Sequence, residues 1–147
     1  MKKVFGEYLG TATLVAIVVG SGIMATSLTK DVALQLLIVA IATVFILAVL
    51  IQMLAPISGA HFNPAVSLVD FLNKGISAKK LALYTVAQVF GGVIGVIYID
   101  FTTTIDQHLG VLTFTLFSVG GQLLSALIID VLSPTDGVRV SAYLVTG

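Results

Sequence analysis

The sequence contains no cysteine and no tryptophan, and charged residues are scarce. Only 10% of its 147 residues carry a charge, and seven basic residues balance seven acidic ones. The absence of cysteine excludes disulfides and thiolate metal sites. Zero net charge and the lack of any basic run exclude a nucleic-acid partner. No paired acids, nucleophile with a base, or cluster of metal ligands is present, so the sequence predicts no enzyme, cofactor or metal site.

Apolar residues dominate instead. They make up 58% of the chain, and the mean hydropathy is +1.13. With histidine counted as neutral, charge is absent from four long intervals, residues 8–29, 32–69, 81–99 and 107–129. A helix needs about 20 apolar residues to cross a bilayer, so each interval has room for at least one crossing. The chain is therefore predicted to be an integral membrane protein whose main partner is the lipid bilayer.

These intervals predict an all-α, polytopic bundle. Helices are expected at Val4–Leu28, Val32–Ala55, Lys79–Thr102 and Gln107–Leu132, with a short polar-interrupted segment at Pro56–Leu72. The first interval is longer than the about 7–15 apolar residues of a cleaved signal peptide, so it predicts a retained helix. The tail Arg139–Gly147 begins like another helix but is too short to cross, so a truncated span is expected there.

Basic residues are divided unequally among the connections. If Pro56–Leu72 dips into the bilayer and returns to the same side, six of the seven basic residues share one face and only Lys30 lies on the other. A full crossing would split them between the faces, so a re-entrant segment is favoured. By the positive-inside rule, the face with the six basic residues is cytoplasmic, and the N-terminus lies on that face. The expected location is a bacterial inner (plasma) membrane. The six residues are Lys2, Lys3, Lys74, Lys79, Lys80 and Arg139.

The stretch ISGAHFNPAVSL, residues 57–68, combines polar residues with a helix start. Irregular backbone at membrane depth survives only where protein buries it or water fills a cavity beside it. Asn63 suits a helix N-cap and Pro64 the first helical position, so Ala65–Leu72 is interpreted as a half-helix. Its N-terminus would direct about half a positive charge toward the bilayer centre, which repels cations. This pattern predicts a path for neutral solutes; for a bare Asn-Pro pair, the start of an interfacial helix is the alternative.

The whole string resembles the first signature of the aquaporin, or major intrinsic protein, family. The resemblance covers about residues 1–95 and implies half of an aquaporin fold. It also implies a passive channel for water or small neutral solutes such as glycerol, assembled as a homotetramer. Other residues that carry it are Glu7-Tyr8-Leu9-Gly10-Thr11, Gly20-Ser21-Gly22, Tyr84, Ala87-Gln88 and Gly91-Gly92.

The resemblance also implies roles for individual pore residues. Asn63 is expected to hydrogen-bond the permeating solute at the pore centre, with Pro64 and Ala65 holding the half-helix against its partner. His61 is expected near the cytoplasmic pore mouth, and a satisfied histidine in a packed loop is the alternative. Thr43 matches a selectivity position that is often a bulky aromatic, which implies a wider or more polar constriction.

A second group of residues is expected to support this segment. Glu7 is an intramembrane acid and therefore a candidate functional residue. The resemblance implies that it braces the loop rather than carrying a proton. Close helix packing is the role expected of the Gly91-Gly92 pair. The residues expected to support the re-entrant loop are Glu7, Gln88, Gly59 and Ser58.

The aquaporin resemblance ends near residue 95. An aquaporin contains two inverted repeats, whereas this chain has a single Asn-Pro-Ala, and Asp136–Arg139 does not reproduce the second one. Residues 91–147 resemble the drug/metabolite transporter superfamily, on Gly121–Ser125 and Asp130. The expected domains are an aquaporin-like repeat, 1–95, and an apparently truncated transporter-like helix pair, 96–147. Two alternative functions stay open, a drug/metabolite-type secondary transporter fragment and a fusion remnant that inserts without conducting.

Overall fold

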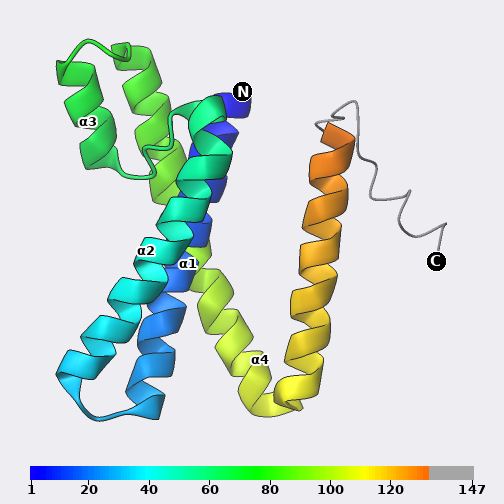
Figure 1. The fold of residues 1–147 in the computed structure, drawn as a ribbon. Helices are drawn as coiled ribbons and strands as arrows, with labels where there is room; N and C mark the ends of the chain where they lie inside the picture. The colour runs from blue at the N-terminus through cyan, green and yellow to red at the C-terminus, as the bar shows by residue number, and fades with distance from the viewer. Residues whose placement is uncertain (133–147) are drawn as a thin grey trace. The chain divides into compact units, whose positions relative to one another are not determined.

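A computed structural model shows the fold (Figure 1) and describes the backbone of residues 1–132 and the side chains of residues 1–105. The predicted tail, Arg139–Gly147, lies outside the described residues. The described backbone contains only helices and their connections, which confirms the predicted all-α class. The chain divides into two compact units after Phe101, and the predicted site lies in the first, Met1–Phe101. The helices are α1 (Lys2–Leu28), α2 (Val32–Ser58), α3 (Pro64–Leu72) and α4 (Ala78–Leu132).

Helix α2 begins where the sequence predicts and ends three residues later. Asp31 caps its start, because Oδ1 accepts hydrogen bonds from the N–H groups of Ala33 and Leu34. Pro56 lies inside the helix, so the prediction that it opens the next segment was wrong. The helix ends instead at Gly59, whose φ of 99° is the left-handed conformation that glycine adopts readily.

Helix α3 is the predicted half-helix, nine residues long. Asn63 is its N-cap and accepts a hydrogen bond from the N–H of Ala65 at 2.8 Å, while Pro64 occupies the first turn. Figure 1 shows that the chain turns back after α2 and that α3 returns to the end of the unit where α2 ends and α4 begins. The segment is therefore re-entrant within this unit.

The predicted break between two C-terminal helices is absent, because α4 continues through residues 103–106. No glycine or proline lies between Gly95 and Gly110 to end the helix. Among the described residues, three segments are long and apolar enough to cross a membrane: Lys2–Leu28, Val32–Ser58 and Ala78–Ile105.

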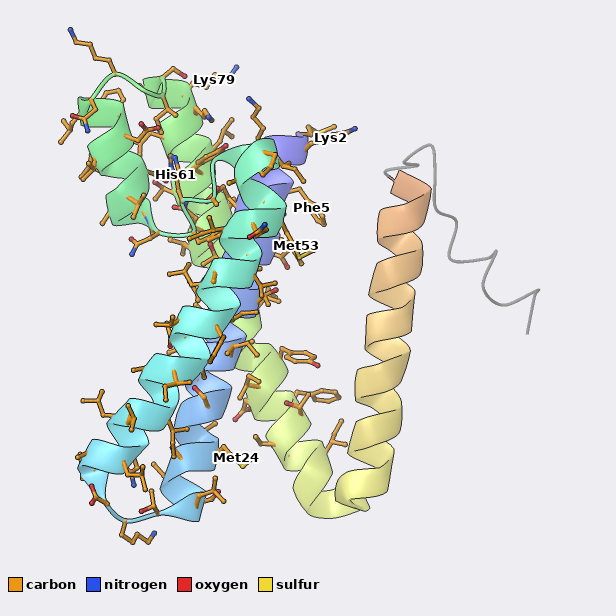
Figure 2. All side chains as sticks on the ribbon, viewed as in Figure 1. Lys2, Phe5, Met24, Met53, His61 and Lys79 are labelled. Carbon is orange, nitrogen blue, oxygen red and sulfur yellow. The ribbon has the colours of Figure 1, made fainter. Side chains whose placement is uncertain are left out.

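Basic residues gather at one end of the first unit. Lys2 and Lys79 lie at the end where α2 stops, whereas Met24 lies toward the opposite end (Figure 2). Lys74 is in the connection between α3 and α4, at the same end as Lys2, and Lys30 is in the connection between α1 and α2. This is the distribution that the charge pattern predicts for a re-entrant segment.

The unit is apolar outside and buries a few polar side chains beside its apolar core. On α2, for example, Leu36, Val44 and Phe45 are each more than 65% exposed. In water such a surface would be costly, whereas lipid tails solvate it. The buried polar side chains of the described part are Glu7, Thr11, Ser58, Ser67 and Gln88.

Helices α1 and α4 approach each other at two glycines. A Cβ added at Gly91 would overlap the backbone carbonyl of Tyr8, and one at Gly95 would overlap that of Ala12. At Gly92 the nearest atom would be an ordinary 3.8 Å away, in a valine side chain. The close approach thus uses Gly91 and Gly95, a small-residue pair four positions apart, while Gly92 has room for a larger side chain.

Candidate functional site

The loop from Gly59 to Asn63 has an unusual backbone. Gly59, Ala60 and Phe62 all have positive φ, of 99°, 54° and 50°. For residues other than glycine this left-handed conformation costs roughly 1–2 kcal/mol each. Such a backbone persists only where surrounding contacts hold it.

Glu7 makes the contacts that hold the loop. Its side chain is fully buried and accepts four hydrogen bonds. Oε1 accepts from the hydroxyl of Ser58 at 2.6 Å and from the backbone N–H of His61 at 3.0 Å. Oε2 accepts from the backbone N–H of Phe62 at 2.6 Å and from Nε2 of Gln88 at 2.8 Å. One carboxylate on α1 therefore ties together the end of α2, the loop and α4.

The last turn of α2 is held from α4 as well. The hydroxyl of Tyr84 donates to the backbone carbonyl of Ser58 at 2.5 Å, and Tyr84 is fully buried. This bond satisfies one of the carbonyls that a helix end leaves without an intrahelical partner. The ammonium of Lys80 lies 4.9 Å from the centre of the Tyr84 ring, which is a cation–π distance.

His61 is held between α3 and the first turns of α4 (Figure 2). Its Nδ1 lies 3.0 Å from the hydroxyl of Ser67, and its Nε2 lies 3.5 Å from Oδ2 of Asp70. Its ring meets that of Tyr84 edge to face at 5.4 Å. Both ring nitrogens have partners and only 11% of the side chain is exposed, as the packed-loop alternative expects.

Asn63 is placed differently from the rest of the loop. The residue is exposed, and its Oδ1 is occupied by the cap of α3. It lines, with Pro64, a groove of about 450 Å³ between the loop, α1 and α4. Thr11 and Gln88 line the same groove, and each has a buried oxygen without a hydrogen-bond partner among the described residues. The other lining residues are Phe62, Gly92 and four valines.

Thr43 is not among the residues that line this groove. It is half-buried on α2, and its hydroxyl donates to the carbonyl of Val39 at 2.7 Å. The structure thus brings Asn63, Pro64 and Gln88 to one groove and leaves Thr43 elsewhere. Glu7 does not line the groove but is hydrogen-bonded to Gln88.

Ser67 was not identified from the sequence, although it is central to the site. It is fully buried and touches both His61 and Gln88. A signal was present, because Asn63, Ser67 and Asp70 have the spacing i, i+4, i+7 that places side chains on one helix face.

These features define a class, an integral membrane helical bundle whose re-entrant half-helix opens on a groove. The major intrinsic protein family model matches residues 1–134, so the chain belongs to that family and is an integral membrane protein. The recognition of this family from the sequence is thereby confirmed. The match crosses the predicted boundary at residue 95, and the division into two domains stays a prediction.

Individual relatives agree with the family match. Aquaglyceroporin AqpS of Rhizobium meliloti (strain 1021) is 53% identical over 94 residues, which are 64% of this chain and 40% of that protein. Aquaporin TIP1-1 of Arabidopsis thaliana is 32% identical over 146 residues, 97% of this chain and 56% of that protein. The chain thus spans about half the length of the relatives that it matches. No solved structure shows a significant match to the chain.

Proposed function

We propose that this chain forms a passive channel for water or small neutral solutes such as glycerol, with Asn63 in the conduction path. The observation that carries the proposal is the position of Asn63 at the start of α3. The residue is exposed on a groove, while the loop behind it is tied to Glu7 by two hydrogen bonds. Because Oδ1 of Asn63 caps the helix, its amide N–H₂ is left to donate to a solute oxygen.

The charge distribution favours neutral solutes. The groove is lined by apolar, hydroxyl and amide side chains and by no charged residue of the described part. The N-terminus of α3 adds a partial positive charge, which repels cations and protons. The hydroxyl of Thr11 and the amide oxygen of Gln88 supply further hydrogen-bonding groups along the groove.

The name of one relative, an aquaglyceroporin, supports solutes larger than water. We extend the proposal to a bacterial plasma membrane, with the N-terminus in the cytoplasm. The basic residues at one end support this orientation, and the bacterial relative supports this membrane. A homotetramer is proposed from family membership alone.

Stopped-flow light scattering on proteoliposomes tests the proposal under water and then glycerol gradients. We expect permeability above that of empty liposomes, and a fall toward that level in Asn63→Asp, which places a charge in the path. Asn73→Asp makes the same chemical change at the C-terminal end of α3 and should conduct like the parent.

Each alternative predicts a different outcome of this experiment. Permeability equal to that of empty liposomes, with insertion verified, would contradict the proposal and favour a non-conducting remnant. Flux that requires an ion gradient would favour a secondary transporter fragment.

A further inference from the structure

The hydroxyl of Ser67 is bonded differently from the hydroxyls of four other helical residues of the described part. Those of Ser21, Thr26, Ser27 and Thr43 each donate to a carbonyl three or four residues earlier in their own helix. This is the common arrangement for serine and threonine within helices. The hydroxyl of Ser67 instead lies between two side chains from outside α3, at 3.0 Å from Nδ1 of His61 and 3.0 Å from Nε2 of Gln88.

The protons of this cluster can be placed by elimination. Nε2 of Gln88 has two hydrogens, and they go to Oε2 of Glu7 and to the oxygen of Ser67. Ser67 therefore accepts from Gln88 and has its own proton left to donate. The facing group is Nδ1 of His61, so that nitrogen is the acceptor and the imidazole proton is on Nε2. Nε2 in turn faces Asp70 at 3.5 Å.

We propose that Ser67 is a positioning residue, which fixes both the orientation and the tautomer of His61 and thereby fastens the loop to α3. The fastening matters because the loop ends at Asn63, where the half-helix begins. A hydrogen-bonded series then runs from Glu7 through Gln88 and Ser67 to His61, whose Nε2 lies 3.5 Å from the Asp70 carboxylate. Any effect of this fastening on conduction rests on the proposed function. The orientation and the tautomer of His61 do not depend on it.

Solid-state NMR of ¹⁵N-histidine-labelled protein in bilayers tests the inference. The sequence has two histidines, so His108→Gln leaves His61 as the only labelled ring. At about pH 8 an ordinary imidazole is neutral. We expect Nε2 to be protonated and Nδ1 to be bare and hydrogen-bonded. In Ser67→Ala the Nδ1 resonance should move to that of a nitrogen without a donor, and Ser67→Thr should restore the parent position.

Two results would overturn the inference. The first is a proton on Nδ1 in the parent spectrum, which needs no variant and so does not depend on how well any variant folds. The second is an unchanged Nδ1 resonance in Ser67→Ala. Ser77→Ala, an exposed serine in the next connection, is the matched control and should leave the resonance unmoved. The spectrum does not depend on flux, so a failure of the channel proposal and a failure of this inference are distinguishable.

Discussion

Replacing Glu7 with glutamine removes one acceptor from a site that presents only donors. The carboxylate accepts from two groups at each oxygen. A glutamine amide has one acceptor oxygen, and its nitrogen must face the other pair of donors. The hydroxyl of Ser58 can rotate and the amide of Gln88 can flip, so these two can adapt. The backbone N–H groups of His61 and Phe62 cannot.

Either orientation of the new amide therefore leaves one buried backbone N–H unsatisfied. An orphaned buried donor costs about 1–3 kcal/mol, and the remaining bonds lose the additional strength that a charged acceptor gives. We expect Glu7→Gln to lower the free energy of unfolding by about 2–4 kcal/mol. The unsatisfied N–H lies in a loop that already contains two residues other than glycine in the left-handed conformation.

The assay is SDS titration in mixed micelles, followed by circular dichroism. Asp31→Asn is the matched control, because it makes the same acid-to-amide change at an exposed helix cap. Both cap bonds of Asp31 go to Oδ1, which asparagine retains, so the change should stay within about 0.5 kcal/mol. If Glu7→Gln also changed the free energy of unfolding by less than about 0.5 kcal/mol, the bracing role of Glu7 would be refuted.

The helix contacts give two further predictions. In the same titration, Gly91→Ala and Gly95→Ala should each lower stability by about 1–3 kcal/mol, because the added methyl meets backbone. Gly92→Ala should be neutral or stabilising by up to about 1 kcal/mol, and equal losses at all three glycines would contradict the close approach. Tyr84→Phe should cost about 1 kcal/mol, because the carbonyl of Ser58 loses its donor; an unchanged midpoint would show that the bond contributes nothing.

Local signals in the sequence predicted most of the helices. Charge-free intervals placed the first two crossings, and Asn63 with Pro64 placed the start of α3 within one residue. These features act locally, through caps and through the length of apolar runs. The wrong boundaries had the same local basis. The sequence predicts a helix end before Pro56 and a connection at residues 103–106. However, a proline near a helix end and threonines within a helix are tolerated when the neighbouring turns continue.

The site was only partly predictable, because its partners are far apart in the chain. The bonds from Glu7 to Ser58 and to Gln88 join residues 51 and 81 positions apart. Two of the four groups that donate to Glu7 are backbone N–H groups. Their direction depends on the positive φ angles of the loop rather than on residue type. Gly95 was missed for a similar reason, since only the packing of α1 against α4 shows which glycines meet backbone.

Conduction by the proposed channel requires that Asn63 lies within the membrane on a water-filled path. The sequence has no cysteine, so single cysteines can be introduced and tested with water-soluble thiol reagents of two sizes. Val44→Cys, 66% exposed on α2, is the lipid-facing control, and Asn73→Cys, at the other end of α3, is the interfacial one. We predict that Asn63→Cys reacts with the small reagent but not with the large one. If Asn63→Cys reacted with neither reagent, as expected for Val44→Cys, the residue would not lie on a water-filled path. If it reacted with both reagents as fast as Asn73→Cys does, it would not lie within the membrane. Either result would contradict the proposed channel.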